Sequence, residues 1–150
     1  RKADAQMDFD FAKVVEASKD NPVFYVQYAH ARICSLRRRI GEAGMNVEAA
    51  PNPDLLDAED LELAKLAAQF PRIVESAALA REPHRIAFYL YDLAAAFHAF
   101  WNVGNDRVDR RILVVNNEEL TISRLYLADA IRQVIANGLS IMGVQPVQEM

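Results

Sequence analysis

The 150-residue chain is 52% hydrophobic and 25% charged, which fits one globular domain with a sizeable core, and it contains no apolar run long enough to span a membrane. Its formal net charge of −4 argues against a protein that coats nucleic acid indiscriminately, because that mode of binding needs a strongly basic surface. The single cysteine, Cys34, excludes an internal disulfide and a CxxC metal or redox site, and it predicts a reducing, cytoplasmic location.

A long helix is expected to begin at Pro22. Asn21 is a good N-cap because its side chain accepts a hydrogen bond from an unpaired backbone N–H, and proline needs no such bond at the first helical position. We expect this helix to run to Ile40 and to end at Gly41 and Gly44, since glycine favours the left-handed C-terminal cap. Its apolar side consists of Val23, Val26, Ala29, Ile33 and Leu36.

Prolines and glycines divide the rest of the chain into further helices. The expected helices cover residues 58–70, 71–80, 83–102 and 119–137, with loops at 44–54 and 103–117, a short apolar turn at 139–142, and a short helix or turn at 8–19 before the first long helix. The expected core positions of three of these helices are Leu61, Ala64, Ala67, Ile73, Val74, Ala77, Leu120, Leu125, Leu127, Ala128, Ile131 and Ile135. The sequence therefore predicts an all-α helical bundle of about five to six helices.

One face of the first long helix carries a stripe of aromatic and basic side chains. At about 100° per residue, Tyr25, Tyr28, Arg32 and Arg39 fall within roughly 60° of one another. Phenol rings stack on nucleobases, and guanidiniums bind phosphates or the edge of a guanine. Tyrosine at helical spacing is more often a core residue, so from the spacing alone both interpretations stay open.

Charge is distributed unevenly around this helix. Residues 21–41 carry four arginines and no acid, giving +4, whereas residues 42–64 carry seven acids and no base, giving −7. A basic helix followed by an acidic stretch predicts a local, oriented anion site. The alternative is a solvated charged face, which is the usual fate of such runs.

No catalytic or metal-binding pattern is present. The glycines are scattered singly, so there is no phosphate loop, and no nucleophile–base pair or carboxylate dyad occurs. His30, His84 and His98 lack a second ligand at metal spacing, and each is better explained by ordinary hydrogen bonding. Cys34 lies near Arg32, and near Arg37, which would lower its pKa, but its helix position faces inward. The residues alone predict a binding or structural domain without catalytic or metal-ligating residues.

Four parts of the chain resemble one family, in that family's order, and one of these parts consists of three short segments. Residues 21–32, NPVFYVQYAHAR, closely resemble the motif that opens the anticodon-binding domain of arginyl-tRNA synthetases. The segments EPHR at 82–85, YLYDL at 89–93 and FHAFWN at 97–102 resemble its central helix. Asp129–Arg132, DAIR, matches the DALR signature with isoleucine in place of leucine, and the end of the chain from Gly143 to Met150 resembles the family's C-terminus.

The resemblance implies the anticodon-binding domain of a bacterial-type class I enzyme. Residues 20–150 would be the helical bundle, and residues 1–19 the remnant of the connection from a catalytic domain, because the chain begins with arginine and lacks the HIGH and KMSKS signatures. The full-length protein would then be an arginine–tRNA ligase that uses ATP and Mg²⁺, while this fragment would need no cofactor and be inactive alone. The implied partners are the anticodon loop of arginine tRNA and the catalytic domain of the same polypeptide, with no membrane and no DNA.

The family's binding roles transfer to the matching positions of this chain. They imply that Tyr25, Tyr28, Arg32 and Met150 surround flipped anticodon bases, the usual mode of sequence-specific RNA recognition, so Met150 should lie beside the stripe. Arg39 belongs to the same face, and Trp101 is added as an aromatic at the end of its helix, with a core indole as the alternative.

Other motif residues are expected to be structural. By helical angle Gln27 and His30 face away from the stripe and would bind, for example, a loop backbone. Asp129 and Arg132, three residues apart, would form a local ion pair. The rival function is a helical protein-interaction module whose Tyr/Arg face binds a partner helix or an acidic peptide. A metal or redox bundle is disfavoured by the ligand spacing above.

Overall fold

The computed structural model describes residues 21–150, so the helix or turn expected at 8–19 lies outside the described residues. Within the described part the chain forms five α-helices, two one-turn 3₁₀ helices and no strand. The all-α class is therefore confirmed. The α-helices are α2 (Pro22–Glu42), α3 (Ala58–Ala68), α4 (Phe70–Ala80), α5 (His84–Asp106) and α6 (Glu118–Ile141), and the 3₁₀ helices are η1 (Pro53–Leu55) and η2 (Val108–Arg110).

The start of α2 is as expected, and its end is two residues later. The Asn21 side chain accepts a hydrogen bond from the Val23 N–H at 3.1 Å, which is the predicted N-cap. Gly41 lies inside the helix rather than ending it. Gly44 alone of the two has a left-handed backbone, with φ of +86°, so the turn out of α2 depends on Gly44.

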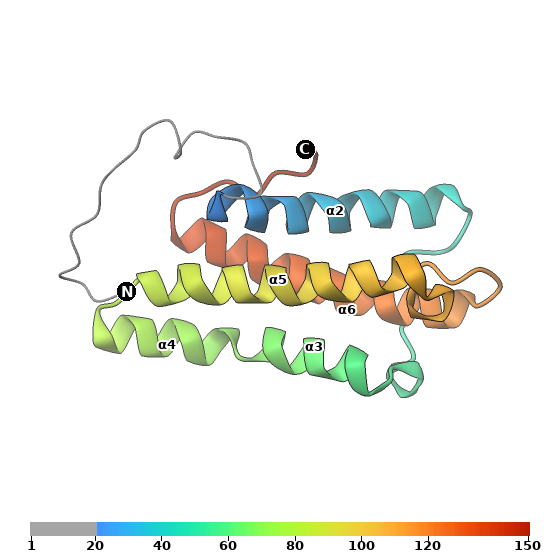
Figure 1. Cartoon of the computed structure of the whole chain (residues 1–150), viewed down its shortest axis with the longest axis horizontal. Coiled ribbons are helices and arrows are strands. Elements are labelled where there is room, and N and C mark those ends of the chain that lie inside the picture. Colours follow the sequence, from blue (N-terminus) through green and yellow to red (C-terminus); the bar gives the residue numbers. More distant parts are fainter. Residues whose placement is uncertain (1–20) are drawn as a thin grey trace.

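The helices pack as an elongated bundle (Figure 1), in which α5 and α6 lie between α2 and the α3–α4 pair. The two helices of that pair are joined end to end, because the linking residue Gln69 keeps a right-handed helical conformation. Pro71 stands in the first turn of α4, where its missing N–H costs no hydrogen bond. The α3–α4 pair therefore forms one bent helical segment that covers one side of α5 and α6, and α2 covers the other side.

The core follows most of the expected positions. Leu125, Ile131 and Ile135 of α6 are at most 1% exposed, and α2 buries its predicted side except at one position. That exception is Val23, which is 43% exposed. In α3 the prediction that Leu61 is a core residue is wrong. Leu61 is exposed, and Leu63, two residues further along the helix, is buried instead.

The end of α6 also differs from the expectation. The helix does not stop at Gly138 but continues to Ile141, so the turn expected at 139–142 is mostly helix. Gly138 serves packing instead, because a Cβ there would lie 2.7 Å from a methyl carbon of Leu90 on α5. Only glycine allows the two helices to approach this closely.

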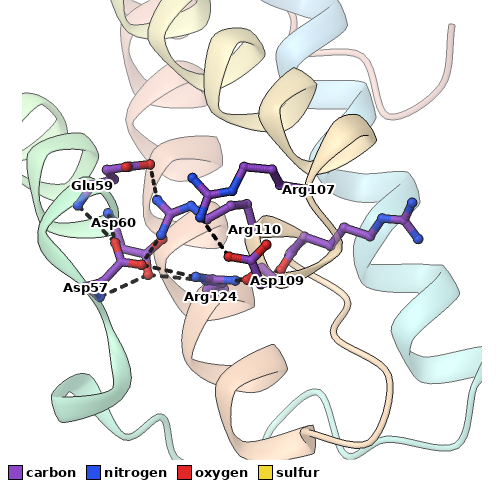
Figure 2. A network of polar contacts seen from close by, with 8 residues as sticks. Asp57, Glu59, Asp60, Arg107, Asp109, Arg110 and Arg124 are labelled. Atoms are coloured by element: carbon purple, nitrogen blue, oxygen red, sulfur yellow. Dashed lines mark hydrogen bonds and ion pairs between the residues drawn. The ribbon is translucent and has the colours of Figure 1, made fainter.

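Buried charges tie α3, η2 and α6 together (Figure 2). The guanidinium of Arg110 forms ion pairs with Asp57 and Glu59, and that of Arg124 donates from Nε to Asp60 at 3.2 Å. Asp60 is fully buried, while Arg110 and Arg124 are 6% and 3% exposed. We call these five residues the buried charge network. Of the seven acids in residues 42–64, Asp60 is buried, whereas Asp57 and Glu59 remain exposed while they pair with Arg110. A freely solvated face is therefore the wrong interpretation of these three acids, because each has an arginine partner.

Candidate nucleic-acid interface

The predicted stripe on α2 lies at the surface. Tyr28 is 42% exposed, Arg39 is exposed, and Tyr25 and Arg32 are half-buried. The core interpretation is therefore wrong for Tyr28 and Arg39. The stripe faces the C-terminal half of α5, which supplies His98 and Trp101.

Arg32 is held by groups that carry no negative charge. One terminal nitrogen donates to the Tyr28 hydroxyl at 2.7 Å, and the other donates to His98 Nδ1 at 3.1 Å. The guanidinium carbon lies 4.5 Å from the centre of the Tyr28 ring and 4.9 Å from that of Trp101, both within cation–π range. A guanidinium has five N–H donors, so this arrangement orients Arg32 while leaving donors for a ligand.

His98 supports this arrangement from beneath. Its side chain is buried, its ring stacks on Tyr28 with centroids 5.4 Å apart, and it also contacts the ring of Tyr25 at 4.7 Å. Burial lowers the pKa of His98 below 6.5, and the positive charge of Arg32 lowers that pKa further. The ring is therefore neutral near pH 7, with Nδ1 as the acceptor and Nε2 facing the Tyr25 carbonyl at 3.4 Å. No pattern in the sequence marked this supporting role of His98.

The C-terminal tail, residues 143–150, lies along α2 and runs in the same direction (Figure 1). Gln27 donates from its side chain to the Gln145 carbonyl at 3.0 Å, and His30 Nδ1 contacts the Val147 carbonyl at 2.8 Å. A carbonyl only accepts, so His30 carries its proton on Nδ1. Burial lowers the pKa of His30. The prediction that Gln27 and His30 bind a backbone segment is confirmed.

The tail, α2 and α5 enclose an open cleft of about 490 Å³, which we call the cleft. The structure brings five of the six predicted site residues to its walls: Tyr28, Arg32, Arg39, Trp101 and Met150. The proximity of Met150 to the stripe is thus confirmed, although the two are more than a hundred residues apart in sequence. Tyr25 does not line the cleft but lies behind it against His98 and Tyr91. The remaining lining residues are Ala31, Ser35, Leu36, Arg38, Gln148 and Glu149.

The four arginines of α2 fall into two pairs. Arg37 forms ion pairs with Asp129 and Glu48, and Arg38 lies 3.3 Å from Glu149. Arg32 and Arg39 have no carboxylate partner among the described residues. Both line the cleft, so its walls hold two uncompensated positive charges in an acidic protein.

The remaining expectations concern structure. The ion pair between Asp129 and Arg132 is confirmed, with Nε to Oδ1 at 2.9 Å. Burial raises the pKa of Cys34, which agrees with the interpretation of an inward-facing thiol that the neighbouring arginines do not activate. Among residues 21–150 no three His, Cys, Asp or Glu side chains gather to hold a metal ion. In the same range, no helix has the length and apolar character needed to cross a membrane.

An all-α bundle with an aromatic and arginine-lined cleft fits an RNA-binding domain, and a family comparison identifies which one. The family model described as the DALR anticodon binding domain matches residues 26–150, so the chain belongs to that family. Its relatives include the arginine–tRNA ligases of Novosphingobium aromaticivorans and Rhodospirillum rubrum, which are 63% and 52% identical over the whole of this chain. The chain spans 26% and 27% of their lengths, or about a quarter.

The fold agrees with a solved structure of the same kind. The arginyl-tRNA synthetase of Thermus thermophilus superimposes with a TM-score of 0.78 at 31% sequence identity. That match covers 97% of this chain and 24% of the Thermus chain. The described bundle is therefore the fold of one part of an arginyl-tRNA synthetase.

Proposed function

We propose that this chain is the anticodon-binding part of an arginine–tRNA ligase and that the cleft holds unstacked bases from the anticodon loop of arginine tRNA. The observation that carries the proposal is the pairing of the α2 arginines: the two that line the cleft without a carboxylate partner, Arg32 and Arg39, are those of the predicted stripe. RNA supplies the acceptors that such guanidiniums lack, on its phosphates and base edges.

The cleft offers both kinds of contact that a flipped base needs. Tyr28 and Trp101 line the cleft with aromatic rings, the side-chain type on which bases stack, and Met150 adds a polarisable apolar side chain to the same lining. Stacking contributes roughly 1–3 kcal/mol per base, so two such contacts suffice for micromolar binding when added to phosphate contacts. Arg32 is already oriented by Tyr28 and His98, which lowers the entropy cost of using its free donors.

Aminoacylation belongs to the rest of the proposed ligase. ATP and Mg²⁺ would act in the catalytic domain of the same polypeptide, and this chain's residues would hold the tRNA so that its acceptor end reaches that domain. The described residues offer no group of metal ligands of their own. A cytoplasmic location is part of the proposal, since the relatives are ligases that charge tRNA and the lone cysteine suits a reducing compartment.

The test compares Arg32→Met with Arg37→Met in the complete ligase. Both changes remove one guanidinium from α2, but only Arg32 lines the cleft. We expect Arg32→Met and Tyr28→Ala to lower kcat/KM for arginine tRNA about tenfold or more, consistent with the loss of one base contact. Arg37→Met should change it less than threefold. Wild-type charging by both cleft variants would contradict the proposal.

The protein-interaction module remains the alternative outcome. An RNA site should prefer the arginine anticodon stem-loop to one with a scrambled loop, and its affinity should fall with added salt in proportion to its phosphate contacts. An acidic peptide that binds better than either RNA would favour the alternative function.

A further inference from the structure

A second cavity adjoins the cleft. It has a volume of about 260 Å³ and lies between α2, the C-terminal end of α5 and the segment 110–115. Leu36, Arg39 and Trp101 line both hollows, so these three side chains form the wall between them. We call this second hollow the side cavity. Its other lining residues are Phe100, Gly104, Asn105, Arg110, Arg111, Ile112, Leu113 and Val115.

The lining of the side cavity combines apolar side chains with exposed polar ones, and it includes the buried Arg110. Phe100, Trp101 and Leu113 are half-buried and offer flat or aliphatic surface, whereas Asn105 and Arg111 are exposed. The terminal nitrogens of Arg111 have no partner among the described residues, because only its Nε is used, in a 2.9 Å bond to the Gly104 carbonyl. Apolar surface and N–H donors in one cavity suit a nucleobase, which is flat and carries acceptors on its edges.

The loop that forms one wall is held rigidly. Arg124 of the buried charge network donates from Nη1 to the carbonyls of Asp109 and Arg111, at 2.8 and 2.9 Å (Figure 2). At Gly104 a Cβ would lie 3.2 Å from the Arg111 backbone, so glycine allows the loop to pack directly on α5. The side cavity is thus preformed, which lowers the cost of binding there.

We propose that the side cavity holds a second base of the same RNA loop, adjacent in sequence to the base in the cleft. This inference rests on the proposed function. Arg39 is exposed, has no carboxylate partner among the described residues and reaches both hollows, so it is placed to contact the phosphate that links the two nucleotides. Trp101, which lines both hollows, then lies between the two bases.

The test uses the complete ligase and a series of arginine tRNAs that lack one loop base at a time. Leu113→Trp fills the side cavity, and we expect it to weaken binding of intact tRNA about tenfold, as the loss of one stacked base would. The same series first identifies the cleft base, as the base whose removal cancels the effect of Tyr28→Ala on tRNA affinity. When the base adjacent to that one is missing, Leu113→Trp should cause no further loss of affinity. An equal loss at every position, or no loss, overturns the proposal.

Two exposed valines give a matched pair that does not depend on repacking. Val115 lines the side cavity and is 70% exposed, whereas Val108 lines neither hollow and is 57% exposed. Each change to glutamate alters the net charge equally, and we expect Val115→Glu to weaken tRNA binding about tenfold and Val108→Glu less than twofold. Equal effects overturn the inference. If Tyr28→Ala did not weaken tRNA binding, the proposed function itself would be overturned. The two failures are therefore distinguishable.

Discussion

Arg32 and Arg39 of the cleft and Arg110 and Arg124 of the buried charge network are the same residue type in opposite surroundings. The network arginines are almost fully buried, and carboxylates of α3 face them. The cleft arginines are open to solvent at least in part and contact neutral groups or none. The difference separates arginines that hold the fold from arginines available to a ligand.

Desolvation explains why the two sets cannot exchange roles. A buried guanidinium without a carboxylate loses its hydration and gains nothing in return, so the network needs both partners. A guanidinium that already has a carboxylate would have to surrender it to bind a phosphate. The cleft arginines avoid this cost because tyrosine, histidine and tryptophan orient Arg32 without neutralising it.

The largest expected effect tests the structural set. Arg124→Met removes one partner of a fully buried carboxylate, Asp60, and two donors to loop carbonyls. Removing one member of a buried pair costs about 3–5 kcal/mol, because the remaining charge is left uncompensated. Urea unfolding at pH 7 should show this loss. As control, Arg85→Met on α5 breaks an exposed pair with Glu82 and should cost less than about 1 kcal/mol. Equal costs would erase the distinction between the two sets.

A smaller effect tests the ligand-binding set through salt. Arg39→Met should reduce the slope of log affinity for arginine tRNA against log salt concentration by about one, as expected for the loss of one phosphate contact. Arg37→Met removes the same charge two positions away, from a side chain already paired with Asp129 and Glu48, and should leave the slope unchanged. Binding titrations at several salt concentrations measure both slopes. An unchanged slope in Arg39→Met would place Arg39 outside the phosphate path.

The helices could be predicted from local sequence signals, whereas contacts between segments distant in sequence could not. Asn21, with the proline after it, marks the start of α2 by hydrogen bonding that depends only on neighbours. Gly138 looked like a helix end because the leucine that requires its small size, Leu90, is distant in sequence. Leu61 and Leu63 are equally apolar, and only the packing of α3 decides that Leu63 is the buried one.

The candidate site shows the same division. Helical spacing gathers Tyr28 and Arg32 on one face, and family resemblance adds Met150 from the far end of the chain. Helical spacing also places Arg39, but not Arg37, on this face, yet it cannot show which arginine of the basic run gains a carboxylate partner. Their roles differ because folding brings Asp129 and Glu48 to one and an open cleft to the other.

The smallest effect concerns the neutral partner of Arg32. The pKa of His98 is lowered in the folded state by burial and by Arg32, so the unfolded chain binds more protons as pH falls through about 6.5. Stability is therefore highest above this value and decreases on acidification. His30 acts in the same direction, because burial lowers its pKa too. We expect the free energy of unfolding to decrease between pH 7.5 and 5.5, measured with urea at each pH.

His98→Gln isolates the contribution of the cleft to this decrease. Glutamine keeps a side-chain oxygen that accepts from Arg32 but does not titrate, so the variant should lose less stability over the same pH interval than the wild type. We assign the decrease in stability that remains in the variant to His30. Asp57 also has a lowered pKa, but carboxylates with lowered pKa values lose their contribution only below about pH 4, outside the interval. An identical decrease in the variant would contradict the prediction that His98 is held neutral in the folded protein. Arg39 would then be the one cleft arginine that still supports the contrast with the carboxylate-paired arginines.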